Sequence, residues 1–107
     1  MPFLELFDET LDINATENYE LSVQISPYEV SFCILDTLRN KFVMLRSYDP
    51  GNEGSYHVSQ IEAIISMDDF LTRRFKKRNI IAFSQKATLV PALLFDESKK
   101  TEYFIYN

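Results

Sequence analysis

The chain is 107 residues long, the size of a single domain, and 46% of its residues are hydrophobic and 25% charged. This composition is typical of a globular domain and excludes a disordered or fibrous chain. The chain has one cysteine, Cys33, and one histidine, His57. An internal disulfide, a cysteine-rich zinc module and a site built on two imidazoles are therefore excluded as well.

The net charge of −5 is unevenly distributed, because residues 1–36 hold eight acidic residues and no Lys or Arg, whereas residues 37–107 are net positive. An acidic chain repels the phosphate backbone, which argues against a dedicated nucleic-acid-binding protein. No apolar run reaches the roughly 18 residues of a membrane span, and the first residues are acidic rather than basic. We therefore expect a cytoplasmic protein that does not bind membranes.

Residues 1–19 lack a sustained hydrophobic period and are interpreted as an extended acidic arm, with a short strand near Leu11 to Ile13. Residues 20–107 are expected to form one domain. Its first part alternates apolar and polar residues between short turns, which predicts a three-stranded antiparallel meander. The predicted strands cover residues 20–26, 30–35 and 41–48.

A helix is predicted over Ser59–Lys77, because Ser59 and Glu62 match a capping box and apolar residues follow at helical spacing. The apolar run Asn79–Ser84 then predicts a buried strand. The remaining predicted elements are a short strand at Ala87–Val90, a helical turn at Ala92–Phe95 and a last helix from Asp96 through Tyr106.

This order of elements predicts an α+β fold, in which the meander and one further strand form a mixed sheet with helices packed on it. The preference for right-handed crossovers makes the strand at Asn79–Ser84 parallel to the first strand of the meander. A profilin-like or longin-like module, which has a similar meander, is the alternative.

Two segments carry a resemblance to a known family: the strand Ser31–Asp36 and the run Leu89–Pro91. From about Ile13 to the C-terminus, the chain resembles an uncharacterised Bacteroidetes family with an actin-like ATPase fold, a ribonuclease H-like architecture. Members of that family are longer, so the chain resembles the first half only. The resemblance implies an actin-like half domain.

The resemblance also locates the places where an ATPase would need its chemistry. Such an enzyme needs an acidic residue near the end of the first strand, to position metal and water, and a glycine in the next turn, to approach phosphate. Gln24 and Ser26 occupy these places, and Pro27 removes an amide donor. A ribonuclease H-like nuclease would need a carboxylate at the same strand position to hold two metals. We therefore predict no catalytic, cofactor-binding or metal-binding residue, which disfavours an enzyme.

Five basic residues lie within a six-residue run, and they are the candidate partner-binding residues: Arg73, Arg74, Lys76, Lys77 and Arg78. One interpretation is a binding site for RNA or an acidic protein. The second is a solvated helix C-terminus, where cations complement the helix dipole. The third is a contact in cis with the acidic arm.

Three other features have a structural interpretation. Cys33 lies in the middle of a predicted strand and is interpreted as a small buried hydrophobic residue rather than a reactive thiol. His57 has no second soft ligand for a metal. Asp68 and Asp69 are interpreted as a helix cap rather than a metal-binding pair.

These observations predict a non-catalytic actin-like scaffold or protein-interaction module, with a domain that binds RNA or an acidic partner through residues 73–78 as the alternative. The apolar end Tyr103–Tyr106 and the outer strand edge predict a homodimer or docking onto a second domain. A terminal helix that folds back on the sheet would instead give a monomer.

Overall fold

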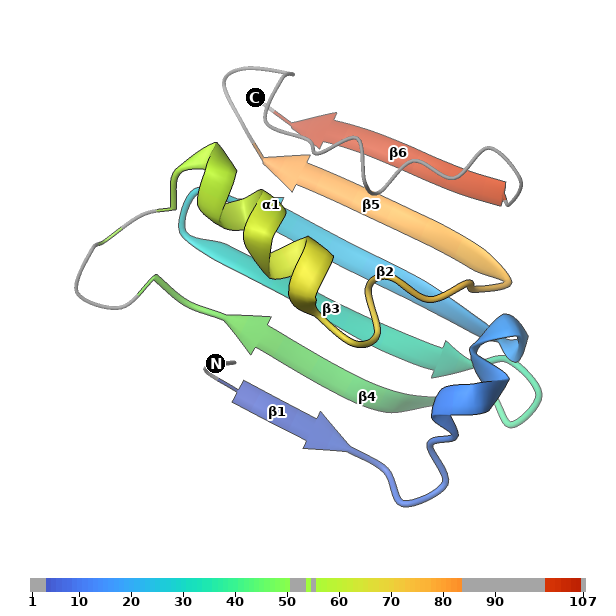
Figure 1. Cartoon of the computed structure of the whole chain (residues 1–107). Coiled ribbons are helices and arrows are strands. Elements are labelled where there is room, and N and C mark those ends of the chain that lie inside the picture. The colour runs from blue at the N-terminus through green and yellow to red at the C-terminus, as the bar shows by residue number, and fades with distance from the viewer. Residues whose placement is uncertain (1–3, 51–53, 55, 84–99, 107) are drawn as a thin grey trace.

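A three-stranded antiparallel meander forms the centre of the protein, as the alternating sequence predicts (Figure 1). The computed structural model describes residues 4–50, 54, 56–83 and 100–106. The meander consists of β2 (Tyr19–Ser26), β3 (Glu29–Asp36) and β4 (Lys41–Tyr48). In β2 every second side chain is buried on one face, which is the period expected of a half-buried strand.

Two parallel strands extend the meander on one side. β5 (Lys77–Phe83) pairs in parallel with β2, and β6 (Lys100–Tyr106) pairs in parallel with β5. The parallel pairing that the crossover rule predicts is therefore confirmed. On the other side β1 (Leu4–Phe7) pairs antiparallel with β4, so the six-stranded sheet has the order β1-β4-β3-β2-β5-β6. The α+β fold with a mixed sheet is confirmed.

The helix α1 (Val58–Met67) lies across one face of the sheet and is shorter than the predicted Ser59–Lys77 (Figure 1). It begins two residues before the expected capping box: His57 is the N-cap, and its backbone N–H donates to Gln60 Oε1 at 2.8 Å. It ends at Met67 because Asp68 adopts an extended conformation. The Asp68 Oδ1 atom then accepts the amides of two following residues and starts a separate turn.

The N-terminal segment differs from the predicted extended arm in its local structure. The strand expected near Leu11 to Ile13 is wrong, because the strand in this region is β1 and a 3-10 helix, η1, covers Ile13–Asn18. Asp12 caps this helix, since its side chain accepts the Asn14 amide at 2.9 Å.

The predicted C-terminal helix is also wrong, because Lys100–Tyr106 forms strand β6. The segment Tyr103–Tyr106 consists of aromatic and β-branched residues, which favour strands when a neighbouring strand is available for pairing. The predicted strand Ala87–Val90 and helical turn Ala92–Phe95 lie outside the described residues, and the description of β6 covers its backbone but not its side chains.

The hydrophobic core lies between α1 and the sheet face that α1 covers. Ile61 and Ile65 of the helix are buried, as are Leu71 and Phe75 of the connection to β5. The apolar residues whose spacing predicted a long helix are thus buried, although Leu71 and Phe75 lie beyond the end of the helix. Among the described helices, none is long and apolar enough to cross a membrane.

Candidate interaction site

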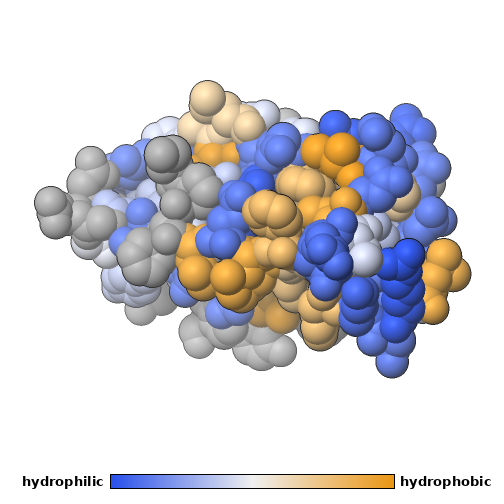
Figure 2. All heavy atoms as spheres, turned by 90° about the horizontal axis from the view of Figure 1, so that it is seen from below, coloured by the Kyte–Doolittle hydropathy of each residue, from blue (hydrophilic) through white to orange (hydrophobic). Residues whose placement is uncertain are grey.

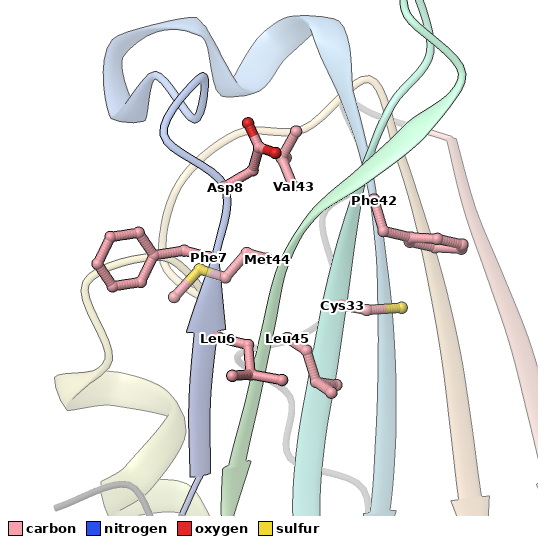
Figure 3. Close-up of a pocket in the computed structure, with 8 residues that line it drawn as sticks. All are labelled: Leu6, Phe7, Asp8, Cys33, Phe42, Val43, Met44 and Leu45. Atoms are coloured by element: carbon pink, nitrogen blue, oxygen red, sulfur yellow. The ribbon is translucent and has the colours of Figure 1, made fainter.

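Apolar side chains gather on the sheet face opposite α1, which we call the open face. Leu6 of β1 pairs with Leu45 of β4, and Leu45 pairs with Cys33 of β3, so these three side chains form a row across the strands. Figure 3 shows Phe42 beside this row. Phe42 and Leu6 expose 66% and 57% of their surface. With Leu4 they form the open-face patch: Leu4, Leu6, Cys33, Phe42 and Leu45.

The patch borders a shallow hollow of about 520 Å³. It ends at Asp8, whose Oδ1 atom lies 3.3 Å from Lys41 Nζ. Hydrogen bonds from the Thr10 hydroxyl and amide, together with Lys41, lower the pKa of Asp8 to about 2. The hollow is therefore apolar along most of its length, with an ionised pair at one end. Its lining residues are Leu6, Phe7, Asp8, Cys33, Phe42, Val43, Met44 and Leu45 (Figure 3).

Cys33 is half-buried and is one of the residues that line this hollow. Burial raises the pKa of its thiol, and a hydrogen bond with Ser22 offsets part of that effect. A thiol with a raised pKa is protonated at neutral pH and is a poor nucleophile. These properties agree with the prediction that the thiol is unreactive, but Cys33 is half-buried on the open face and not buried as predicted.

The strand β1 forms one edge of the sheet and exposes apolar residues on both faces. Leu4 and Leu6 point to the open face, whereas Phe7 lies on the side of α1 and exposes 66% of its surface. Figure 2 views the molecule from this edge and shows orange and pale orange apolar side chains gathered along its centre. Among the described strands, only β4 pairs with β1, so the outer edge of β1 has no strand partner.

A buried arginine anchors β1 to the rest of the fold. Arg46 of β4 is 8% exposed, and its Nε lies 2.8 Å from Glu5 Oε2. Its Nη1 bonds Asp68 Oδ2 at 3.0 Å and Asp69 Oδ1 at 2.7 Å. The guanidinium also lies 5.4 Å from the centre of the Phe70 ring. One cation therefore joins the edge strand, the meander and the turn after α1.

The charges of this cluster stabilise one another. Burial disfavours the charged form of Arg46, but the hydrogen bonds to Asp69 and Asp68 outweigh burial and raise its pKa above the ordinary value. The same contact with Arg46 lowers the pKa of Asp69. Burial and the bond that its hydroxyl donates to Asp68 raise the pKa of Tyr48. The cluster therefore forms a salt-bridge network that connects β1, β4 and the turn after α1 at neutral pH.

The turn between β2 and β3 is the place where an actin-like ATPase would approach phosphate. Here Ser26 Oγ accepts the amides of Tyr28 at 3.2 Å and Glu29 at 3.0 Å. Pro27 has no amide proton, and its carbonyl accepts the Tyr56 amide. Three successive positions of the turn thus have no amide directed at a ligand. Gln24 is exposed on the open face at the end of β2.

The first three residues of the basic run lie in the connection between α1 and β5, and the last two, Lys77 and Arg78, begin β5, so none of the five lies on a helix. Their interpretation as a helix C-terminus is therefore wrong. Arg74 and Lys76 are exposed, whereas Arg78 is buried and bonds the carbonyl of Arg73. The Lys76 amide bonds the Tyr19 carbonyl at 2.9 Å. Lys77 is half-buried.

The same connection runs beside the acidic N-terminal segment. Lys77 pairs with Glu20 in the parallel ladder, directly after the bond between Lys76 and Tyr19. This pairing brings the backbone of Lys77 next to that of Glu20, and the contact in cis with the acidic arm stays a prediction. The structure does not bring the five basic side chains together as one exposed patch, because Arg78 points into the core.

The acidic pair Asp68 and Asp69 contributes to the local structure after α1, and His57 lies at the start of α1. Asp68 caps the turn after α1, and its neighbour Asp69 bonds Arg46, as the capping interpretation predicts for the first of them. His57 is exposed at the start of α1. Within the described ranges no group of three or more His, Cys, Asp or Glu residues is placed to hold a metal ion.

Sequence reasoning missed the open-face patch and the Arg46 cluster. The signal for the patch was present, because β3 is apolar at Cys33 and Leu35 as well as on its buried face. The segment Leu4–Phe7 is too short to establish a period. The ionic cluster had no local signal, since Arg46 and Asp68 are 22 residues apart.

The fold of this chain matches part of an actin-like ATPase fold. It is similar to the crystal structure of a Bacteroides thetaiotaomicron protein with actin-like ATPase fold and unknown function, with a TM-score of 0.61 and 24% identity. The match covers 83% of this chain and 34% of that protein, so this chain spans about a third of its length. Among curated proteins no relative matches.

The sequence also matches a protein family, which is a more specific assignment than the fold. Residues 8–107 match the family described as "Protein of unknown function (DUF3822)", and the chain belongs to that family. The resemblance to an uncharacterised family with an actin-like fold is thereby confirmed.

Proposed function

We propose that this chain is a non-catalytic protein-interaction module of the cytoplasm, built on half of an actin-like fold. The observation that carries the proposal is the open-face patch, where Phe42 and Leu6 are more than half exposed around a hollow. Contiguous apolar surface of this kind is costly to leave in water and is typical of protein interfaces. The patch lies on three hydrogen-bonded strands, which hold its residues in place.

The non-catalytic part of the proposal rests on the turn after β2. Phosphate binding at such a turn requires backbone amides directed at the ligand. Ser26 Oγ occupies the amides of Tyr28 and Glu29, and Pro27 has none. Gln24 carries no charge with which to hold Mg²⁺.

Calorimetry with ATP and Mg²⁺, combined with a phosphate-release assay, tests this part. We expect no saturable heat and no turnover. The matched variant is Gln24→Ala, at the exposed position where an actin-like ATPase would carry its acidic residue, because loss of turnover in this variant would assign the turnover to this chain. Saturable micromolar binding with turnover that Gln24→Ala removes would overturn the non-catalytic proposal.

The second candidate function is binding of RNA or an acidic protein through the basic run. Arg74 and Lys76 are both exposed in the connection before β5, which favours it. With only these two side chains fully exposed, we expect a shallow dependence of affinity on salt. A gel-shift titration at two salt concentrations tests it, with the double variant Arg74→Ala/Lys76→Ala as the control. Absence of a shift at low salt removes this candidate.

A further inference from the structure

We propose that the occupant of the β1 edge is a second copy of this chain, whose own β1 pairs antiparallel with it about a two-fold axis at Leu6. This inference rests on the proposed function, for which it names the partner and the surface. The outer edge of β1 has no partner among the described strands. An unpaired strand edge is a template for another strand.

The composition of β1 leaves this edge unprotected. Strand edges are usually guarded by charged residues or proline. The four residues of β1, Leu4–Phe7, contain one charge and no proline. That charge, Glu5, lies 2.8 Å from the Arg46 guanidinium and is therefore neutralised within its own chain. The other three residues are apolar and exposed.

Symmetry limits the register of the pairing, and charge selects the position of the axis. In an antiparallel pair of identical strands, opposite residues lie on the same face only when their numbers add to an even total. An axis at Glu5 would set the two Glu5 residues against each other. An axis at Leu6 sets Leu6 against Leu6 on the open face and Glu5 against Phe7 on the other. The second register avoids the like-charge pair, and we assign it.

The same register joins the two open-face patches. In each copy Leu6 lies beside Leu45. Pairing of the two Leu6 residues at the axis therefore connects the apolar row of one copy to the apolar row of the other. The apolar row thus continues without interruption across the axis. In this register Leu4 of one copy lies opposite Asp8 of the other. Asp8 is the last residue before the turn after β1, and its charge is paired with Lys41 of the same chain.

The size of the interface predicts its strength. A strand of four or five residues spans roughly 15 Å, and an interface built on it belongs to the small class of less than about 1,200 Å² in total. Interfaces of that size support reversible association rather than a permanent dimer. We therefore expect a monomer of 12.5 kDa at low concentration and a dimer as concentration rises.

Light scattering or sedimentation over a concentration series is the first test. We expect the average mass to rise toward twice that of the monomer. In Leu6→Lys, two like charges face each other across the axis, so the dissociation constant should rise at least about tenfold. Met67→Lys, at a residue 84% exposed on α1, is the matched control and should leave association unchanged.

Cross-linking tests the register itself. In a Cys33→Ser background, Leu6→Cys places two thiols opposite each other at the axis, with Cβ atoms about 4.5–5.5 Å apart, close to the separation of about 3.5–4.5 Å in a disulfide. Mild oxidation should yield a covalent dimer. Leu38→Cys in the same background, at an exposed residue of the β3–β4 turn, should not.

A protein that stays monomeric at its highest attainable concentration overturns the proposal. So does a dimer that Leu6→Lys does not weaken, or one that cross-links through Leu38→Cys and not through Leu6→Cys. A monomer that also lacks ATP turnover would overturn self-association alone and leave the non-catalytic module intact, whereas turnover would overturn that module whatever the oligomeric state.

Discussion

Arg46 Nη1 and Asp68 Oδ2 lie 3.0 Å apart, and this contact joins the meander to the turn in which α1 ends. Asp68 is 4% exposed and uses both carboxylate oxygens: Oδ1 accepts the amides of Phe70 and Leu71, and Oδ2 accepts from Arg46 and Tyr48. A buried carboxylate with all of these partners ends the helix and fixes the start of the next segment. The pair therefore determines how α1 sits on the sheet.

Replacing the cation of this pair should destabilise the protein strongly. Arg46→Met removes the partner of three carboxylates and leaves the buried Asp68 without its cation, so we expect a loss of about 3–5 kcal/mol in the free energy of unfolding. Urea denaturation measures it. Arg39→Met, at an exposed arginine whose Nε lies 3.8 Å from Asp36, is the control and should cost less than about 1 kcal/mol. Equal losses in the two variants would contradict the role given to Arg46.

The two functions of Asp68 can be separated. Asp68→Asn retains an oxygen that accepts the amides of Phe70 and Leu71 but loses the charge that faces Arg46, whereas Asp68→Ala loses both. We therefore expect Asp68→Ala to be the less stable variant by about 1 kcal/mol or more, the usual value of a lost cap. Thermal denaturation of the two variants tests it. Equal stability would show that the cap contributes nothing.

Stability should fall in acid, and the sign follows from the shifted carboxylates. Hydrogen bonds and Arg46 lower the pKa of Asp69, and Thr10 with Lys41 lowers the pKa of Asp8 to about 2. A carboxylate with a lower pKa in the folded state stabilises the fold above its unfolded pKa of about 4. This contribution is lost as the pH falls through the folded pKa. Urea midpoints from pH 7 to pH 2.5 should decline below about pH 4, and less steeply in the double variant Asp8→Asn/Asp69→Asn.

The sequence predicted the elements whose signal is local. The alternation of Leu21, Val23 and Ile25 predicted β2, and the apolar run after the helix predicted β5. The end of α1 was predicted wrongly, because the apolar spacing continues through Leu71 and Phe75 and only the buried partners of Asp68 show that the chain leaves the helix there. The spacing of apolar residues indicates which residues are buried. A turn that buries residues at the same spacing as a helix therefore cannot be distinguished from a continuing helix by this pattern.

The candidate site was less predictable than the fold for a related reason. An edge strand of four residues contains too few positions to distinguish a strand from a loop, and its neighbours in the patch come from β3 and β4. Whether Leu6 lies beside Leu45 depends on the register of β1 against β4, which no local pattern records. The aromatic end at Tyr103–Tyr106, from which the sequence predicted association, became strand β6 because β5 offers it a parallel edge.

The packing of α1 on the sheet can be tested through the exposure of its two faces. Ile65 is 1% exposed and packs on the sheet, whereas Met67 is 84% exposed. Ile65→Ala should cost about 2–5 kcal/mol through lost burial and the cavity it leaves. Met67→Ala should lie within about 0.5 kcal/mol of the unmodified protein. A destabilising effect at both positions would mean that Met67 is covered.

The basic run provides the last prediction, because its members differ in burial although they are neighbours in sequence. Arg78 is 4% exposed, donates to the Arg73 carbonyl and lies 6.0 Å from the centre of the Phe75 ring. Arg78→Ala removes packing as well as a charged hydrogen bond, so we expect a loss of about 2–3 kcal/mol. Arg74→Ala, at an exposed position, should change stability by less than about 0.5 kcal/mol. If Arg78→Ala were neutral in denaturation and abolished binding of an acidic partner, the arginine would belong to a binding surface and not to the core.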